Sequence, residues 1–412
     1  MSESTERNHA GVASAEDALP IIVQKYGGSS VADAEKIKRV AERVAKTRAS
    51  GKRVVVVVSA MGDTTDELLA LARKVSADPH RRELDMLLSA GERISMALLG
   101  MALQDRGVEA VSFTGSQSGI ITDGSHTNAR ILEVRPVRIF EELARGKVVI
   151  VAGYQGVSRE KEVTTLGRGG SDTTAVALAA ALSAELCEIC SDVDGVYTAD
   201  PRIVAGAKRL AELTHEEMQE LALSGAKVLN AQAVEFARDR GITIHARSTF
   251  ASGAGTRVGR AGAVRELRIS GVSLENDLLI VRAPGGLART RALRELFTQH
   301  GAWPRELRDD GKLAHAIIPL ENVHGLPRLI EALAAVPHAE VFEGLALVSL
   351  VGSGVGATAE PLERALAALL EIAPPAEFFS GPLRLSFLLP RERAADAVRA
   401  LHRAFIESAT TT

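Results

Sequence analysis

Residues Thr164–Thr174 have the sequence TTLGRGGSDTT, a glycine-rich loop that leads directly into an alanine-rich segment. The loop combines flexible backbone, one fixed cation (Arg168), hydroxyl side chains and one carboxylate (Asp172) at the point where we expect a helix to begin. The N-terminus of a helix presents unpaired backbone N–H groups and the positive end of the helix dipole. The segment therefore predicts an anion-binding site.

A second loop of the same kind lies near the N-terminus. Lys25–Ser30 (KYGGSS) precedes residues 31–48, whose apolar side chains have helical spacing. The Lys25 ammonium can reach a phosphate from this position, while Gly27 and Gly28 let backbone N–H groups approach it. The chain has no GxxxxGK[ST] sequence, which argues against a P-loop enzyme. Together the two loops indicate phosphoryl chemistry of another type.

The first half of the chain alternates short apolar runs with helical patterns. Val54–Val58 is an unbroken β-branched run, as is typical of a strand buried on both faces of a parallel sheet. The other expected strands are Ile21–Val23, Ala110–Phe113, Val148–Val151, Leu186–Ile189 and Ile242–Ile244. This order predicts an α/β fold with a parallel-rich central sheet sandwiched by helices, and ligands at the carboxyl ends of the strands.

The C-terminal part has a different pattern. Small residues at 251–256 mark the end of the first domain, and residues 265–405 alternate shorter strands and helices. The expected strands are Leu278–Val281, Ala314–Ile318, Leu345–Val351 and Leu383–Leu389, and the expected helices are 288–300, 325–336, 360–372 and 394–406. This pattern predicts two successive small antiparallel α+β units, of the kind that more often bind regulatory ligands than carry catalysis.

Composition limits the function classes. The 412 residues carry a net charge of −3 and only 3% aromatic side chains, which provides neither the basic surface nor the stacking platforms of a nucleic-acid-binding protein. No apolar run has the length of a membrane span. Residues 1–19 mix charged and small polar side chains, so we expect a disordered tail rather than a signal peptide, and a cytoplasmic protein.

The two cysteines, Cys187 and Cys190, form a CxxC motif. A structural zinc site would need two further ligands, and the sequence contains no second CxxC or HxxxH pair. Because Leu186–Ile189 has the character of a strand, the two thiols are expected to point to opposite faces. We interpret them as small buried apolar residues rather than as a redox or metal site.

Six segments occur in an order that resembles the aspartate kinases (aspartokinases) of the amino acid kinase fold. They are Lys25–Ser30, Val58–Gly62, Gly91–Arg93, Thr164–Thr174, Ser191–Arg202 and Gly225–Leu229. The resemblance implies a catalytic domain at 20–260, followed at 265–405 by two small units that are more loosely similar to the tandem ACT regulatory domains of that family.

The implied reaction is ATP-dependent phosphorylation of the side-chain carboxylate of L-aspartate, giving 4-phospho-L-aspartate and ADP. This reaction is the first step of the aspartate-derived amino acid pathway, or here of a specialised branch of it. The implied cofactors are ATP and Mg²⁺. No protein carboxylate is assigned to the metal, because Mg²⁺ bridges the nucleotide phosphates and takes few protein ligands.

The resemblance also assigns roles to residues by their position. It implies that Lys25, Arg168 and Asp172 carry catalysis, with Arg168 gripping the α-carboxylate of aspartate and Glu92 taking its ammonium. The residues implied for substrate binding are Ser59, Thr65, Glu92, Tyr154, Arg168 and Ser171. Those implied for ATP binding are Lys25, Gly27, Gly28, Ser29, Ser191, Asp192, Tyr197, Asp200, Arg202 and Lys227.

Several of these residues also have a simpler interpretation. Glu92 could be an exposed charge on a helix, and Asp172 could be a helix cap. Asp200-Pro201-Arg202 has the composition of an ordinary turn. The residues alone leave these alternatives open.

The chain departs from the family pattern at several positions. Asn230-Ala231 follows Gly225–Leu229 where the family usually has His-Pro, and Ser191 stands where Thr is usual. Arg282–Gly286 replaces the usual effector-facing loop of the first regulatory unit. The sequence therefore predicts intact catalysis with eroded feedback control, that is, an enzyme that escapes inhibition by lysine or threonine.

Two other functions remain open at this point. One is an enzyme of the same fold that phosphorylates a different carboxylate, a carbamate or a nucleotide, and the pair Glu92 and Arg168 argues instead for an amino acid substrate. The other is a non-catalytic subunit whose ACT repeats regulate a partner, and the presence of Lys25 and Asp172 argues against it. Because ACT-type sheet edges tend to pair across a two-fold axis, we expect a homodimer.

Overall fold

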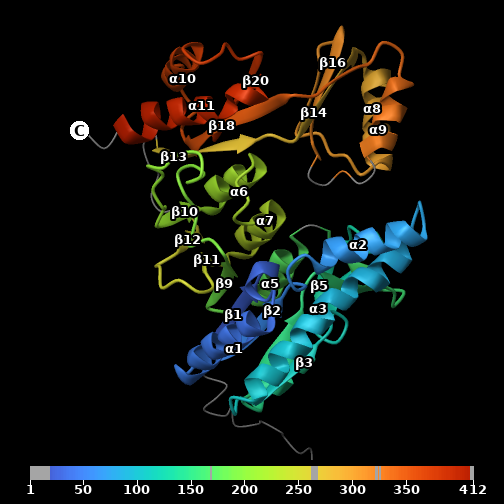
Figure 1. Cartoon of the computed structure of the whole chain (residues 1–412), viewed down its shortest axis with the longest axis vertical. Coiled ribbons are helices and arrows are strands. Elements are labelled where there is room, and N and C mark those ends of the chain that lie inside the picture. Colours follow the sequence, from blue (N-terminus) through green and yellow to red (C-terminus); the bar gives the residue numbers. More distant parts are fainter. Residues whose placement is uncertain (1–18, 168, 261–267, 321–322, 324–325, 409–412) are drawn as a thin grey trace, which may run out of the picture. The chain divides into compact units, whose positions relative to one another are not determined.

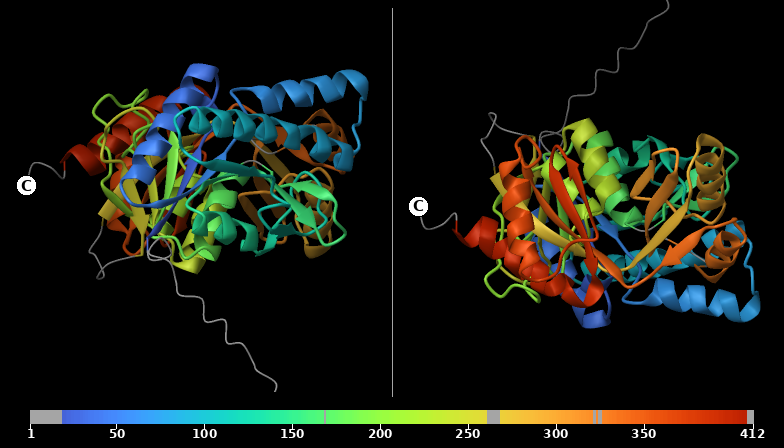
Figure 2. Two further views of the ribbon diagram at one scale, coloured as in Figure 1. Left: turned by 90° about the horizontal axis from the view of Figure 1, so that it is seen from below. Right: turned by 90° about the horizontal axis from the view of Figure 1, so that it is seen from above.

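The computed structural model describes residues 19–167, 169–260, 268–320, 323 and 326–408. The chain forms two compact units, and each is described by itself. The first contains the chain up to Gly195 together with Gln232–Arg260, and the second contains Val196–Ala231 and the C-terminal part that begins at Ala261. Figures 1 and 2 show the helices and strands of both units.

The central sheet of the first unit has the strand order β12-β11-β9-β1-β2-β6-β3. The strands are β1 Ile21–Tyr26, β2 Arg53–Val58, β3 Ala110–Phe113, β6 Val148–Ala152, β9 Leu186–Ser191, β11 Ile244–Ser248 and β12 Thr256–Gly259. All neighbours in this order pair in parallel except β11 and β12, which are antiparallel. The parallel-rich α/β sheet predicted from the apolar runs is thereby confirmed.

Helices cover both faces of this sheet. The helices that pack on it are α1 Ala34–Ala49, α3 Arg81–Gln104, α4 Val137–Ala144 and α5 Gly170–Ala181, while α2 Thr64–Val75 packs on α3, and α7 Ala231–Arg240 precedes β11. α1 and α3 pack side by side (Figure 1) and bury Val40, Val44 and Leu99 against the even-numbered valines of β2. α5 packs on β1, β2 and β9 from the opposite face and is buried along most of its length.

A second, small sheet in this unit was not predicted. It has the order β5-β4-β7-β8, with bounds β4 Ile120–Thr122, β5 Ile131–Val134, β7 Gln155–Ser158 and β8 Val163–Thr165. Its strands are three or four residues long, so their sequences carry little periodicity. The sheet matters for function because β8 ends where the glycine-rich loop begins.

Helix α3 is long and apolar enough to cross a membrane by length and composition, and it is the one such helix among the described residues. The sequence expectation that no run has this length is therefore wrong by that criterion. Half of its most apolar window is buried inside the molecule, and the carboxylates of Asp85 and Glu92 lie on its buried side. These are the properties of a core helix in a folded domain.

The second unit contains two four-stranded antiparallel sheets with the orders β15-β16-β14-β17 and β13-β18-β20-β19. The strands are β13 Arg268–Glu275, β14 Leu278–Pro284, β15 Glu306–Asp309, β16 Leu313–Pro319, β17 Glu340–Phe342, β18 Leu345–Ser353, β19 Glu377–Gly381 and β20 Arg384–Pro390. The helices are α8 Leu287–Gln299, α9 Leu326–Ala334, α10 Glu360–Leu370 and α11 Arg391–His402. The two predicted α+β units are therefore present.

The two units are not built from strictly successive segments, however. β13, at the start of this region, pairs with β18 and joins the sheet formed by the end of the chain. The whole β14–β17 segment, with α8 and α9 side by side on its sheet (Figure 1), is thus inserted between two neighbouring strands of the other sheet. The second unit also holds β10 Glu212–Thr214 and α6 His215–Leu223, which begins with a capping box formed by Thr214 and Glu217.

Cys187 and Cys190 lie on β9 and are both buried and free, as predicted. Burial in apolar surroundings raises the pKa of the Cys187 thiol and raises that of Cys190 to about 12, so neither forms thiolate near neutral pH.

We expect no labelling of either thiol by a disulfide reagent in the native protein at pH 8, and labelling of both after addition of guanidinium chloride. Rapid labelling of the native protein would contradict their assignment as core residues.

Candidate functional site

The candidate site lies at the carboxyl edge of the central sheet. Tyr26, Val58 and Ala152, which end β1, β2 and β6, are in register across the three neighbouring strands. The backbone N–H groups that follow continue the pairing: Ser59 donates to the Tyr26 carbonyl at 3.1 Å, and Gly153 donates to the Val58 carbonyl at 3.0 Å. Three loops that carry site residues predicted from separate parts of the sequence therefore begin side by side, as the rule for parallel sheets requires.

Lys25 and Asp172 form an ion pair at this edge. Lys25 points from β1 toward the first turn of α5, where its Nζ lies 2.6 Å from Asp172 Oδ1, and the two side chains are only 13% and 11% exposed. Asp172 is not the helix cap that the sequence also allowed, because the N-cap residue of α5 is Gly169 and no side chain caps the helix. A nearly buried lysine held by one carboxylate is a preorganised cation rather than a surface charge.

Gly27 and Gly28 let the backbone turn closely beside this cation. A Cβ on Gly27 would lie 3.7 Å from Lys25 Nζ, and a Cβ on Gly28 would lie 2.9 Å from the Ala60 carbonyl oxygen. The Gly62 N–H donates to the Gly28 carbonyl at 3.1 Å, so the loops after β1 and β2 are fastened together. Ser29 follows in a short 3-10 turn at Gly28–Ser30 and is exposed.

The glycine-rich loop joins β8 to α5. Gly167 and Gly169 have φ values of +75° and +72°, the left-handed region that L side chains rarely adopt, so glycine is required at both positions. Arg168, between them, lies outside the described residues. Ser171 is buried against Gly153, whose added Cβ would lie 2.9 Å from Ser171 Oγ. Tyr154 contacts Gly170 in the same way and is itself held at a φ of +66°.

Glu92 is buried on α3 and is not the exposed charge that its sequence context allowed. Its Oε1 accepts the Ala60 N–H at 3.1 Å, while Oε2 is buried with no hydrogen-bond partner among the described residues. Burial raises the pKa of Glu92 to about 7. Gly91 permits this packing, since a Cβ there would lie 2.7 Å from the Ala60 Cβ. A buried carboxylate with one oxygen left without a partner is suited to receive a cation from a ligand.

Ser59 and Thr65, the other predicted substrate residues, lie on the loop after β2 and in the first turn of α2, and both are half-buried. Thr64, the neighbour of Thr65, packs against Gly91 beside Glu92. The substrate residues that the structure describes thus fall into two groups, one around Ala60 and one around Gly153.

The predicted nucleotide residues divide between the two units. Ser191 ends β9, where its Oγ accepts the Val193 N–H at 3.3 Å, and Asp192 beside it is exposed. Tyr197, Asp200, Arg202 and Lys227 belong to the second unit. Arg202 pairs with the Asp200 carboxylate at 2.7 Å and donates its N–H to it at 2.9 Å, which is the turn that the sequence also allowed. The part of these residues in ATP binding stays a prediction.

Two buried carboxylates near the site were missed. Asp85, on α3, accepts hydrogen bonds from Thr165 and from the Thr127 backbone. Glu188, on β9, accepts from Gln24 at 2.7 Å and from Arg247 at 2.9 Å. Their partners lie 42 to 164 residues away in the chain, so no local pattern could have indicated them.

The arrangement suits phosphoryl transfer to a carboxylate. A fixed cation, glycine-lined backbone and the N-terminus of α5 converge on one edge of the sheet, where phosphate oxygens would be stabilised. The Glu92 carboxylate beside the loop after β2, with Oε2 unpartnered among the described residues, can select an acceptor that carries an ammonium. Among the described residues no cluster of three or more His, Cys, Asp and Glu side chains could hold a metal ion.

Comparisons with known proteins agree with this description. Residues 20–248 match the amino acid kinase family. An aspartokinase of Mycolicibacterium smegmatis is 46% identical over 94% of this chain and 96% of its own length, and one of Corynebacterium glutamicum is 45% identical with the same coverage. The crystal structure of E. coli aspartokinase III in complex with aspartate and ADP is similar with a TM-score of 0.81 and 26% identity, over 93% of this chain and 99% of that one.

The fold and the site define a phosphotransferase of the amino acid kinase family, and the chain belongs to that family. Because these two relatives match over almost their whole length, its place within the family is among the aspartokinases, which are ATP-dependent kinases. The resemblance inferred from six short segments is thereby confirmed, as is the expectation of an enzyme.

Proposed function

We propose that this chain transfers the γ-phosphoryl group of ATP to the side-chain carboxylate of L-aspartate, giving 4-phospho-L-aspartate and ADP. The observation that carries the proposal is the Lys25–Asp172 ion pair at 2.6 Å, together with the buried Glu92 carboxylate on α3, whose Oε2 has no hydrogen-bond partner among the described residues. The curated relatives named as aspartokinases support the acceptor.

In this reaction a side-chain carboxylate oxygen of the acceptor attacks the γ-phosphorus, and the bond from that phosphorus to the β–γ bridging oxygen breaks. Negative charge is spread over the γ-phosphoryl oxygens and the departing ADP. Lys25 would stabilise that charge, and Asp172 would fix the position of its ammonium. Glu92 would take the α-ammonium and Arg168 the α-carboxylate, with Ser59, Thr65, Tyr154 and Ser171 completing the pocket. Only the side-chain carboxylate is then left to react.

Mg²⁺ would accompany the nucleotide and neutralise phosphate charge. The residues present fit such a complex, because Lys25 and the glycine backbone suit the phosphates and the Asp172 carboxylate beside them offers oxygen. The predicted nucleotide residues Ser191, Asp192, Tyr197, Asp200, Arg202 and Lys227 are proposed to complete ATP binding.

The proposal is tested by coupled detection of ADP with L-aspartate and its close analogues as acceptors, in the presence of Mg²⁺. Formation of aspartyl hydroxamate with hydroxylamine identifies the acyl phosphate product. If aspartate gave neither ADP nor hydroxamate, the proposal would fail, and release of ADP with another acceptor would reassign the substrate.

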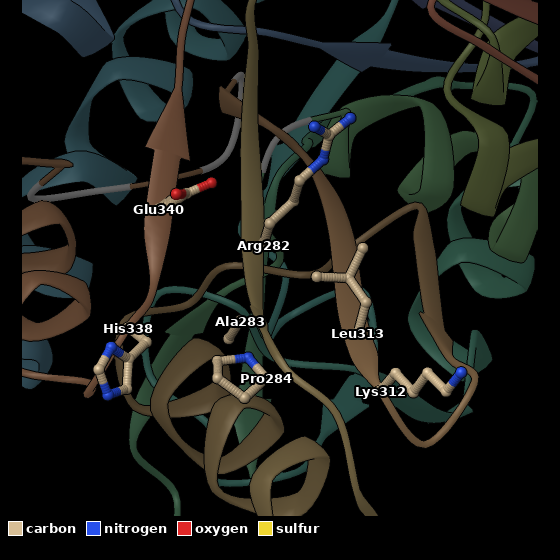
Figure 3. A pocket seen from close by; sticks show the side chains of 7 residues that line it. All are labelled: Arg282, Ala283, Pro284, Lys312, Leu313, His338 and Glu340. Carbon is tan, nitrogen blue, oxygen red and sulfur yellow. The ribbon is translucent and has the colours of Figure 1, made fainter.

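The regulatory region contains a small cavity of about 240 Å³, lined by Arg282, Ala283, Pro284, Lys312, Leu313, His338 and Glu340 (Figure 3). The Arg282 guanidinium is paired with Glu377 at 2.6 Å. The N-terminus of α8, just beyond Pro284, is also occupied, because the Gly286 N–H donates to the Asp309 carboxylate at 2.9 Å. A carboxylate-bearing effector at this helix end would have to displace Asp309.

We therefore expect the enzyme to retain most of its rate in millimolar lysine or threonine, because groups that would bind the effector carboxylate are already paired within the chain. Initial rates with subsaturating aspartate, with and without each amino acid, provide the measurement. E. coli aspartokinase III, at 25% identity, has a crystal structure in complex with lysine and aspartate, so that enzyme is a suitable positive control. Strong inhibition of this chain by either amino acid would contradict the expectation.

We further propose a homodimer in the cytoplasm. The sheets of the second unit end in edge strands, β15 and β17 in one and β13 and β19 in the other, and of these β13 is partly covered by the hydrogen bond from the Val272 N–H to the Thr198 carbonyl at 2.8 Å. Such edges can pair with a second copy about a two-fold axis. Sedimentation equilibrium of the purified chain would measure the oligomeric state.

A further inference from the structure

We propose that Asp85 is a positioning residue for the phosphoryl acceptor, which it serves by fixing the glycine-rich loop that follows β8. The inference rests on the proposed function, because it assumes that this loop binds the acceptor. Asp85 is not among the residues predicted to contact substrate, and its position is set by contacts within the first unit.

The Asp85 carboxylate is completely buried and is bound through both oxygens. Oδ1 accepts from the Thr165 hydroxyl at 2.6 Å and from the Thr127 N–H at 3.0 Å, and Oδ2 lies 2.6 Å from His126 Nδ1. Burial of a carboxylate destabilises the folded protein unless such hydrogen-bond partners are present. Removal of one partner therefore also disturbs the contacts with the others. The carboxylate thus fastens α3 to two segments that are far from it in sequence.

Both segments border the glycine-rich loop. Thr165 is the last residue of β8, and its carbonyl accepts the Ala129 N–H at 2.8 Å. Asn128 Oδ1 lies only 2.7 Å from the place where a Cβ on Gly167 would be. Thr127 has a φ of +68°, which is unusual for a β-branched residue, and its N–H is the group that Asp85 binds. Asp85 therefore holds the base of the loop and the turn beside it.

The same helix also holds the other part of the acceptor pocket. Glu92 lies seven residues, or about two helical turns, after Asp85 on α3, so the two carboxylates share one face of the helix. Glu92 holds the loop after β2 through the Ala60 N–H, as Asp85 holds the loop after β8 through Thr165. One rigid helix thereby sets the separation of the loop proposed to take the α-ammonium from the loop proposed to take the α-carboxylate.

The test uses two variants that remove this contact from either side: Asp85→Ala removes the carboxylate, and Thr165→Val removes only the hydroxyl that it binds. A misplacement of about 1 Å in a bound reactant can cost on the order of 10²-fold, so we expect the KM for L-aspartate to rise about tenfold or more in each variant. The KM for ATP should remain within about twofold. Because Asp85→Ala already removes the contact that Thr165→Val breaks, the double variant should be little worse than Asp85→Ala alone.

Thr122→Val is the matched control. Thr122 and Thr164 share a buried hydroxyl contact of 2.6 Å in the same small sheet, so its loss lowers stability without releasing the loop. We expect a lower melting temperature for this variant with an unchanged KM for aspartate. The inference is overturned if this control raises that KM as much, if both KM values rise together in Asp85→Ala, or if Thr165→Val, the milder change, leaves the KM for aspartate unchanged.

Calorimetric titration of the wild-type chain with L-aspartate separates this inference from the proposed function. If wild-type protein neither binds nor phosphorylates aspartate, the proposed function fails, and the variants are then compared on the acceptor that the substrate panel identifies. If wild-type protein uses aspartate and the variants bind it normally, the role of Asp85 alone is wrong.

Discussion

Replacement of Lys25 by alanine is expected to lower kcat by about 10²–10⁴-fold, with a much smaller effect on the KM for aspartate. The reason is that the ammonium is held in place before the reaction. It lies 2.6 Å from Asp172, and both side chains are nearly buried at the end of β1 and the start of α5. Charge that develops on the phosphoryl oxygens is then stabilised without reorganisation of solvent. Single-turnover measurement of ADP formation would determine the effect.

Two further variants show whether the loss arises from catalysis or from folding. Lys25→Ala leaves Asp172 without its partner, so Lys25→Met, which keeps most of the aliphatic volume, should be equally slow while disturbing packing less. Lys52→Ala removes a lysine that pairs with Glu185 at 2.8 Å on the surface of the same unit, and it should turn over normally. Turnover at the wild-type rate in Lys25→Ala would refute the role given to Lys25.

The architecture of the first unit could be predicted because its signals are local. Val54–Val58 contains five buried valines, and the run alone identifies an interior strand of a parallel sheet. β11 shows the limit of that reasoning. Its expected position was Ile242–Ile244, whereas the strand spans Ile244–Ser248, where buried residues alternate with the half-buried His245 and Arg247. Polar residues at alternate positions conceal a strand from a search for apolar runs.

The site was predicted in part, and for a clear reason. The glycine loops and Lys25 lie in short segments whose spacing carries the information, so their convergence at one sheet edge follows from the fold. The burial of the Glu92 carboxylate cannot be predicted from such a segment. Gly-Glu-Arg on a helix suggests an exposed charge, and only the packing of Ala60 against Gly91 shows that the carboxylate is buried. Asp85 gave no signal at all, because its partners lie 41 to 80 residues away.

In the regulatory region, too, contacts between distant parts of the chain could not be predicted from local sequence patterns. The periodicity located its helices and the long strands, but pairing of β13 with β18 joins residues that are about 80 positions apart around an inserted sheet. Successive repeats are the simplest interpretation of a repeated pattern in sequence. Only the hydrogen-bonded pairing of β13 with β18 shows that the β14–β17 repeat is inserted within the other repeat.

Glu92→Gln is expected to weaken aspartate binding and at the same time to stabilise the ligand-free protein at pH 8. Truncation of one partner in a buried, hydrogen-bonded charge pair costs about 2–5 kcal/mol, so the KM for L-aspartate should rise on the order of 10²-fold or more. The Ala60 N–H keeps its acceptor in the glutamine variant, because the amide oxygen can replace Oε1. The loss is thus specific to the charge that would meet the α-ammonium of the substrate.

The effect on stability has the opposite sign because burial raises the pKa of Glu92 from its ordinary value to about 7. The folded protein therefore binds a proton that the unfolded chain releases at lower pH, so the contribution of Glu92 to stability is present in acid and is lost as the pH rises through about 7. The Glu92→Gln substitution removes this pH-dependent loss of stability, because glutamine does not ionise. Chemical denaturation between pH 5 and pH 8 should show a smaller decline in the variant, and the KM of the wild-type chain for aspartate should fall across the same range as Glu92 ionises.

Glu188→Gln provides the matched comparison on the same unit. Burial opposes ionisation there too, but hydrogen bonds from Gln24 and Arg247 outweigh it and lower the pKa of Glu188. Its contribution to stability is therefore present above its ordinary pKa and lost only in acid, and the variant should be less stable at pH 8 with little change in the KM for aspartate. If Glu92→Gln behaved like Glu188→Gln, losing stability while keeping its affinity for aspartate, Glu92 would be a structural carboxylate and the acceptor's ammonium would have to bind elsewhere.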